Sequence, residues 1–342
     1  MPASASMLLR ALCAVVVALA MLPLRVCAAP LQDYVFVEDD DLRAIEPLLR
    51  RPEIAGAQTV HAWKSLEPEP GRYDFSAIER ELAFVTARGK SLYVQIQDRF
   101  FTPEARNLPD YLLRDPVYGG GLVAQTDRPG EGVPQVQGWV AQQWNAALRT
   151  RFQLLLAALA ERFDGRIAGI NLAETAVDID TRHDRSGFSC DAYFRATIEN
   201  LRAARAAFRR SRVVQYVNFW PCEWDDDHRY MSRLFDLALR EDIGLGGPDV
   251  VPWQRAQMHN AYALFHRHRG RLSTVAMAVQ GPTLSYRDPS TGRPFTRAAL
   301  RGFARDYLGA DIVFWSSRAP WLRSMRDRHA AHRAIYPPNR RF

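Results

Sequence analysis

The amino-acid sequence predicts an α/β fold with a single domain, a (β/α)₈ or TIM barrel. Eight short stretches are rich in apolar and β-branched residues, as buried strands are, and most are separated by stretches whose apolar residues recur at helical spacing. No linker or shift in composition divides the chain. A doubly wound sheet is the alternative arrangement, but no glycine-rich fingerprint follows the first strand.

Each expected element follows from a local pattern. The strands are the apolar stretches at residues 34–37, 54–63, 91–97, 166–175, 213–219, 243–249, 274–279 and 311–315. The helices are the stretches of helical spacing at residues 42–49, 77–88, 145–162, 191–209, 230–240, 253–267 and 296–308. Ser76 is expected to cap the second helix and Gly89 to end it, and the pair Asp164-Gly165 turns the chain into the fourth strand.

A long segment, 98–138, shows no regular pattern. It contains five prolines and the glycine triplet at 119–121. Irregular segments of this length inside a domain are usually functional or disordered, and we expect this one to form a cleft wall. The glycines lack the strand-turn-helix setting of a phosphate loop, so no nucleotide or other cofactor is expected.

The N-terminus has the pattern of a secretory signal peptide. Arg10 precedes an apolar run at 11–24, and Val26-Cys27-Ala28 supplies the small residues of a cleavage site. We therefore expect a signal peptide at 1–28 and a mature barrel domain at 29–342. The protein would be periplasmic or secreted, with no membrane association after cleavage, and an uncleaved anchor is the alternative.

The cysteines predict one disulfide bond. Cys13 and Cys27 lie in the expected signal peptide, which leaves Cys190 and Cys222 in the mature chain. Because exported chains meet an oxidising compartment, we expect these two to pair. A closed loop of about 30 residues would contribute roughly 3–4 kcal/mol of stability. Two separate buried thiols are the alternative.

Charge and motifs exclude several classes of partner. The net charge of +7 comes almost wholly from arginine, and removal of 1–28 takes away two arginines, which leaves 7 − 2 = +5. The arginine-rich stretch 202–212 predicts the solvated face of a helix, so no nucleic-acid partner is expected. The acidic run at 225–228 lacks EF-hand spacing and the histidines lack the H-E-x-x-H pattern, so no metal is expected. No oligomeric state is indicated.

Glu174 is the strongest catalytic candidate. It stands where the fourth strand ends, and the carboxyl ends of barrel strands form the face that carries the chemistry. Aromatic, amide and acidic residues stand at or near other strand ends: Trp63, Gln97, Asn218, Trp220, Asp249, Trp253, Gln280 and Trp315. Indole rings stack on sugar rings and amides bond hydroxyl groups, so this set predicts a carbohydrate site. The alternatives are a Glu174 that caps a segment or pairs with arginine, and tryptophans that belong to the core.

The segment 63–75 carries a resemblance to known enzymes. Its pattern, W-x-x-x-E-P-x-P-G-x-Y-D-F, resembles the signature after strand two of several (β/α)₈ glycoside hydrolases, and strand order and spacing extend the likeness over residues 33–320. These enzymes place an acid/base after strand four and a nucleophile after strand seven. The resemblance implies that Glu174 is the acid/base, Trp315 the aromatic residue after strand eight, and Glu67 a structural residue that holds the turn.

This chain departs from the pattern of those enzymes at two positions. Ala173 stands where they usually have asparagine, and the nearest candidate is Asn171. Gln280 stands at the nucleophile's place, and an uncharged amide is a poor nucleophile. Three explanations are open: the alignment of strand seven is shifted, the site binds glycans without cleaving them, or another carboxylate acts, namely Asp249, Asp178 or Glu223.

The sequence thus predicts an exported glycoside-hydrolase-like protein that acts on a polysaccharide or oligosaccharide. Its catalytic candidates are Glu174 and Asp249. Its expected substrate-binding residues are Trp63, Gln97, Asn171, Asn218, Trp220, Trp253, Gln280 and Trp315. The alternative is a catalytically inactive glycan-binding or polysaccharide-assembly protein with the same cleft.

Overall fold

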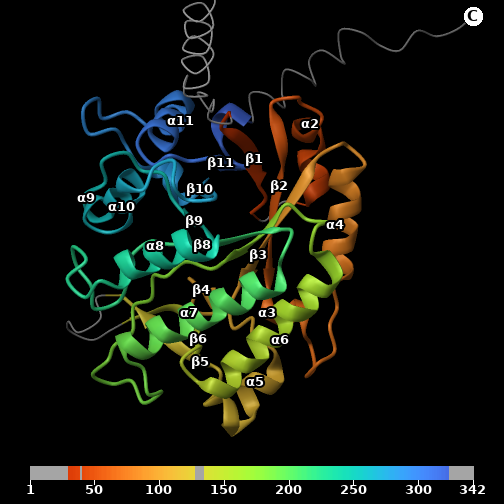
Figure 1. Ribbon diagram of the computed structural model, residues 1–342, viewed down its shortest axis with the longest axis vertical. Helices are drawn as coiled ribbons and strands as arrows, with labels where there is room; N and C mark the ends of the chain where they lie inside the picture. The colour runs from red at the N-terminus through yellow and green to blue at the C-terminus, as the bar shows by residue number, and fades with distance from the viewer. Residues whose placement is uncertain (1–29, 39–40, 128–134, 323–342) are drawn as a thin grey trace, which may run out of the picture. The chain divides into compact units, whose positions relative to one another are not determined.

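Eight parallel strands close into a barrel in the order β1-β11-β10-β9-β8-β7-β3-β2. The computed structural model describes residues 30–38, 41–127 and 135–322, and the described residues from Leu31 to Leu322 belong to one compact unit. Figure 1 shows the strands with helices placed around them. The predicted single-domain (β/α)₈ barrel is therefore confirmed as the fold, and the predicted signal peptide lies outside the described residues.

The expected elements are all present, with ends that differ by a few residues. The barrel strands are β1 (Gln32–Phe36), β2 (Ile54–Ala62), β3 (Ser91–Gln97), β7 (Gly169–Leu172), β8 (Arg212–Tyr216), β9 (Gly244–Gly247), β10 (Val275–Val279) and β11 (Ile312–Ser316). The helices between them are η1 (Leu42–Ile45), α2 (Glu46–Leu49), α3 (Trp63–Leu66), α4 (Ser76–Thr86), α6 (Ala146–Phe163), α7 (Cys190–Ala207), α8 (Tyr230–Glu241), α9 (Arg255–His259), α10 (Ala261–Arg267), η3 (Pro282–Ser285) and α11 (Arg297–Asp306). The helix expected at 253–267 is divided at Asn260, where φ is −110° and ψ −104°.

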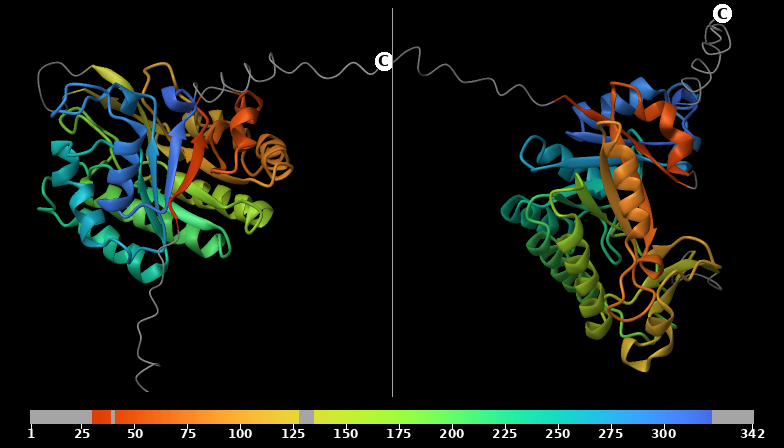
Figure 2. Two further views of the ribbon diagram at one scale, coloured as in Figure 1. Left: turned by 90° about the horizontal axis from the view of Figure 1, so that it is seen from above. Right: turned by 90° about the vertical axis from the view of Figure 1, so that its right-hand side faces the viewer.

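The segment expected to be irregular contains a small antiparallel sheet, which corrects the prediction for 98–138. Its strands are β4 (Arg99–Phe100), β5 (Leu122–Thr126) and β6 (Val136–Ala141), in the order β4-β6-β5, together with α5 (Asp110–Arg114) and η2 (Pro116–Tyr118). The surrounding prolines and glycines conceal the strand pattern in the sequence. Figure 2 shows this insert gathered at one end of the barrel, where Thr126 N donates to Asp178 O at 2.8 Å.

Aromatic side chains fill the interior of the barrel. The ring of Tyr34 lies 5.4 Å from that of Tyr93 and 5.5 Å from that of Phe314, in edge-to-face geometry. Higher in the barrel, Gln58 Nε2 donates to the hydroxyl of Tyr216 at 2.9 Å. The interior is therefore a packed core rather than a pore, as in other barrels of this size.

The turn after β2 is held by Glu67, as the sequence predicts. The Glu67 carboxylate is fully buried and accepts from the indole N–H of Trp63 at 2.9 Å and from Gly71 N at 2.9 Å. Arg151 of α6 forms an ion pair with the same carboxylate. This one side chain ties the turn, α3 and α6 together.

The predicted disulfide bond between Cys190 and Cys222 is confirmed, with a Cα–Cα distance of 6.3 Å. It joins the start of α7 to the loop between β8 and α8. Among the described helices, none has both the length and the hydropathy needed to cross a membrane.

Candidate active site

Glu174 stands two residues beyond β7, at the carboxyl end of the barrel, and is partly buried. Its carboxylate accepts a hydrogen bond from Asn218 Nδ2 at 2.7 Å. Asn218 follows β8, and its own side-chain oxygen accepts from Gln257 Nε2 of α9. The two amides form a chain that fixes the orientation of the carboxylate from one side.

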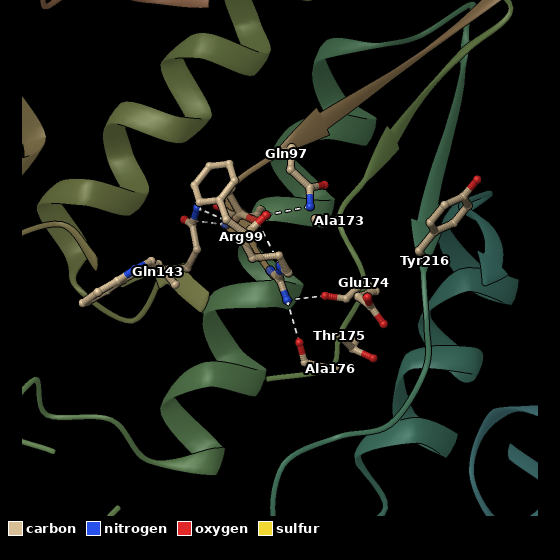
Figure 3. A network of polar contacts seen from close by, with 12 residues as sticks. Gln97, Arg99, Gln143, Ala173, Glu174, Thr175, Ala176 and Tyr216 are labelled. Carbon is tan, nitrogen blue, oxygen red and sulfur yellow. Dashed lines mark hydrogen bonds and ion pairs between the residues drawn. The ribbon is translucent and has the colours of Figure 1, made fainter. Parts of the chain in front are cut away.

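Arg99 holds the backbone that carries Glu174. Figure 3 shows the guanidinium directed at the carbonyl oxygens of Glu174 and Ala176, and it donates to both. Arg99 is buried and pairs with Asp98 at 3.0 Å. The hydroxyl of Tyr193 accepts from Arg99 at 2.9 Å and donates to Thr175 O at 2.9 Å. The backbone after β7 is thus held in place by hydrogen bonds from the charged side chain of Arg99.

The pKa of Glu174 is raised to a value near neutral pH. Burial raises the pKa of Glu174 from its ordinary value of 4.5 to about 7. The hydrogen bond from Asn218 and the charge of Arg99 lower this pKa but do not outweigh burial, and repulsion from Asp249 and Asp178 raises it further. A carboxyl group with such a pKa can both donate and accept a proton near pH 7.

Asp249 and Asp178 are the carboxylates whose charges act on Glu174. Asp249 follows β9, is partly buried, and accepts a hydrogen bond from the hydroxyl of Thr283. Burial raises the pKa of Asp249, and burial also raises the pKa of Asp178. Two carboxylates therefore contribute to the raised pKa of Glu174.

Gln280 follows β10 and is partly buried. The neighbouring Gly281 N donates to Glu38 Oε1 at 2.6 Å, and the other carboxylate oxygen of Glu38 pairs with Arg318 at 3.2 Å. The carboxylate of Glu38, which lies at this strand end, is thus already paired with a backbone N–H group and an arginine. Gln280 itself remains an amide at the position that the resemblance assigns to a nucleophile.

Of the expected substrate-binding amides, Gln97 is hydrogen-bonded within the protein and Asn171 is enclosed by it. Gln97 Nε2 donates to Arg99 O at 2.6 Å, and its side-chain oxygen accepts from Gln95 Nε2 at 3.2 Å. Asn171 is fully buried inside the barrel, paired in register with Gln95. The structure therefore places the amide of Asn171 in the barrel core, where it is not exposed at the surface.

Three of the tryptophans that were expected to stack on sugars have enclosed rings in this structure. Trp63 packs on Phe152 with ring centroids 5.1 Å apart, and Trp220 packs on Phe194 at 5.2 Å. Trp315 alternates with inward-facing neighbours on β11, so it points outward, and its indole N–H donates to Asp33 at 2.9 Å. A ring without an accessible face cannot stack on a ligand.

Trp253 is accessible but lies elsewhere. Its side chain is 60% exposed and packs on Phe303 of α11 at 5.2 Å and on Tyr307 at 5.1 Å. The loop after β9 therefore sets this indole against α11 and the residue that follows it. The prediction that it binds substrate beside Glu174 is therefore not supported by its position.

The sequence did not single out several residues that build the site: Arg99, Gln257 and Thr283. Their partners come from loops that are distant in the chain, so no spacing reveals them. Within the described part of the chain, no group of three or more His, Cys, Asp or Glu side chains has the arrangement to hold a metal ion.

Comparisons with known proteins bear on the fold. No family model matches the chain, and no curated protein matches it. Among solved structures, the catalytic domain of a beta-amylase from Paenibacillus polymyxa superposes with a TM-score of 0.56 at 10% identity, covering 84% of this chain and 92% of that one.

Two further neighbours are a family 39 glycoside hydrolase from Bacteroides cellulosilyticus WH2 and a beta-galactosidase from Marinomonas ef1. Their TM-scores are 0.52 and 0.51, both at 12% identity, over 84% and 83% of this chain. The chain spans only 56% and 54% of their lengths. The chain therefore has a glycoside-hydrolase-like (β/α)₈ fold, and at these identities the likeness establishes the fold alone.

Proposed function

We propose that the protein hydrolyses glycosidic bonds in an oligosaccharide or polysaccharide, with Glu174 as the general acid. The observation that carries the proposal is a partly buried carboxyl group with a pKa of about 7, held at the carboxyl end of the barrel by Asn218 and Arg99. A protonated Glu174 would donate its proton to the glycosidic oxygen as the bond to the leaving sugar breaks.

Asp249 is the second catalytic group of this proposal. Its charge acts on Glu174, and the hydroxyl of Thr283 orients its carboxylate. Since Gln280 cannot form a glycosyl ester, the mechanism consistent with these residues is inverting, in which an ionised Asp249 activates water on the opposite face of the sugar. An inverting pair requires a carboxyl separation of about 6.5–9.5 Å.

Gln280 favours a second candidate, a protein that binds glycans without cleaving them. In that case Glu174 and the amide of Gln280 would bond sugar hydroxyls, and no water would be activated. Both candidates require an accessible carbohydrate site around Glu174.

Export belongs to the same proposal. The signal-peptide pattern at residues 1–28 and the disulfide bond between Cys190 and Cys222 support a periplasmic or secreted protein. Carbohydrate is then the expected partner, since polysaccharides are the abundant polymers outside the cell membrane.

A panel of neutral and acidic polysaccharides, assayed for release of reducing ends, tests the proposal. The wild type should release reducing ends from at least one polymer, while Glu174→Gln and Asp249→Asn should each lose most of this activity, because each removes a proton donor or acceptor from the reaction. Release by Gln280→Glu alone would contradict hydrolysis by the native protein and favour the glycan-binding function.

A further inference from the structure

A surface groove lies between the β7–α7 and β8–α8 loops, and its lining begins three residues after Glu174. It has a volume of about 400 Å³, within the range of sites that bind small ligands. One wall contains Val177 and Asp178, which follow Glu174 in the chain, and the other contains Phe219 and Trp224. Asp178 connects the groove to the proposed acid, because its charge acts on Glu174.

Trp224 gives the groove an exposed aromatic surface. Its side chain is 49% exposed, and its ring stacks on the imidazole of His259 with centroids 5.1 Å apart and an angle of 26° between the planes. His259 ends α9, the helix whose Gln257 bonds Asn218, the hydrogen-bond partner of Glu174. His259, which stacks on the indole, and Gln257, which orients the partner of the carboxylate, thus both belong to α9. Figure 1 places α9 on the same side of the barrel as α8.

The loop that presents Trp224 is held in an unfavourable backbone conformation. Cys222, Asp225, Asp226 and Arg229 all have positive φ, at 65°, 56°, 60° and 60°. Non-glycine residues rarely adopt such angles, and clusters of them persist where surrounding contacts enforce a required geometry.

Those enforcing contacts are present on both sides of Trp224. The disulfide bond to Cys190 fixes Cys222, and the buried carboxylate of Glu223 accepts from the backbone N–H groups of Tyr230 and Met231. Trp224 N donates to Asp227 Oδ1 at 3.1 Å. At the inner end, the hydroxyl of Thr175 donates to Phe219 O at 2.8 Å, which fixes this loop to the residue after Glu174.

The negative charges that line the groove favour uncharged sugars over negatively charged ones. Asp178 and Asp227 are exposed on its walls, and no arginine or lysine lines it among the described residues. Carboxylates accept hydrogen bonds from sugar hydroxyls but repel uronate and sulfate groups. A flat indole face beside hydroxyl acceptors fits an uncharged pyranose ring.

We propose that this groove is a binding subsite for a neutral oligosaccharide of at least two sugar residues, with one residue on Trp224 while the neighbouring residue lies at Glu174. The inference rests on the proposed function in that it places the adjoining residue at the proposed acid. In this inference, the disulfide bond keeps the indole of Trp224 at a fixed position relative to Glu174.

The experiment measures binding to the Glu174→Gln variant, which keeps the ligand intact. The probes are glucan, xylan, mannan and galactan fragments of four to six residues, together with polygalacturonate fragments of the same length. Isothermal calorimetry should detect at least one neutral fragment and no polygalacturonate. Adding Trp224→Ala should weaken that binding by about tenfold or more, because the stacking surface is removed.

Trp253→Ala is the matched control, because it also removes an exposed indole but one that packs on Phe303 of α11. It should leave the affinity unchanged. The double variant Cys190→Ser with Cys222→Ser, checked by circular dichroism to be folded, should bind more weakly than its parent.

The outcomes separate this inference from the proposed function. If the wild type cleaves a polymer but Trp224→Ala binds and cleaves like Trp253→Ala, the subsite is wrong and hydrolysis stands. If Trp224→Ala weakens binding while the wild type releases no reducing ends, the subsite stands and hydrolysis is wrong. Binding of none of the neutral fragments at millimolar concentration, or preference for polygalacturonate, overturns the subsite.

Discussion

Among single residues, Glu174 shows how one carboxyl group can serve reactivity at the expense of stability. Its pKa is raised because the folded protein withdraws it from water more than Asn218 and Arg99 stabilise its charge. A group that holds its proton more tightly in the folded state destabilises the fold as pH rises through the interval between its unfolded and folded pKa values. The stability of this protein should therefore reveal the acid.

Glu174→Gln is expected to stabilise the protein at alkaline pH. The interval runs from about 4.5 to about 7, so the wild type should lose up to roughly 3 kcal/mol relative to the variant between pH 4 and pH 8. Urea denaturation of both proteins across this range measures it. Equal stabilities at pH 4 are expected, and equal stabilities at pH 8 as well would mean that the pKa of Glu174 is not raised.

Asn218→Ala is expected to raise the pKa of Glu174 further. The amide of Asn218 donates to the carboxylate at 2.7 Å, and a donor to the charged form favours ionisation. Titration of the Glu174 carboxyl carbon by NMR measures the shift. Gln280→Ala is the control, since no hydrogen bond joins Gln280 to Glu174 among the described residues; a shift in the control but not in Asn218→Ala would contradict the assignment.

Sequence patterns locate Glu174 at a strand end but do not reveal that three of the tryptophans are enclosed, and the difference has a physical cause. The end of a buried strand can be found from its apolar run, and a carboxylate there faces the open end of the barrel. Whether the last aromatic residue of a strand points inward depends on the exact register. Trp315 is one position out of phase with Phe314 and is therefore buried outside the barrel. The amide chain from Gln257 joins separate loops and leaves no local signal.

Among the elements, the disulfide bond is the main constraint on the loops around the groove. Cys190 begins α7, and Cys222 lies 32 residues later, in the loop before α8. Reduction, or the double variant Cys190→Ser with Cys222→Ser, should lower the free energy of unfolding by about 3–4 kcal/mol, since the closed loop restricts the unfolded chain. Guanidinium denaturation with and without reductant measures this. An unchanged midpoint would show that the bond contributes nothing to folding stability.

Asp164 connects α6 to β8, and a second prediction concerns the stability of this connection. Burial raises the pKa of Asp164, but backbone N–H groups of Arg209, Arg210 and Ser211 donate to it at 3.0, 2.9 and 2.7 Å and lower the pKa overall. Asp164→Ala should cost about 1–3 kcal/mol at pH 7, because it removes a charged acceptor shared by three backbone N–H groups, one of which belongs to the buried Ser211. The cost should shrink as pH falls through the carboxyl range. Thermal denaturation at pH 7 and pH 3 measures it, and a cost independent of pH would contradict the explanation.

The predictability of the elements depended on how each is stabilised. Strands buried on both faces and amphipathic helices carry their patterns in the sequence, so all eight barrel strands were found. The sheet formed by β4, β5 and β6 lies on the barrel's end, and its strands pair across Gly138, where a Cβ atom would lie 1.9 Å from Phe100 O. Such a sheet depends on contacts between loops, and its glycines and prolines resemble those of irregular structure.

For the whole molecule, Glu67 joins the start of the chain to its middle. Its fully buried carboxylate accepts hydrogen bonds from Trp63 and Gly71 and forms an ion pair with Arg151. Glu67→Ala should destabilise the fold by about 3–5 kcal/mol, because Arg151 is left partly buried without its counter-charge. Urea denaturation measures this. Glu69→Ala is the matched control in the same turn, since its ion pair with Arg72 is exposed on both sides and should contribute about 0–1 kcal/mol. Similar costs for the two variants would contradict the structural role of Glu67.

The pairing of β1 with β11 has a consequence for how the protein is made. β1 is among the earliest described segments to leave the ribosome, yet its partner β11 is the last described strand. Until Ile312–Ser316 has emerged, β1 and β10 both present unpaired backbone groups that invite association with other chains. Completion of the ring therefore waits until this last described strand is available. A chain cut short before β11 should accumulate in inclusion bodies rather than as a smaller native protein.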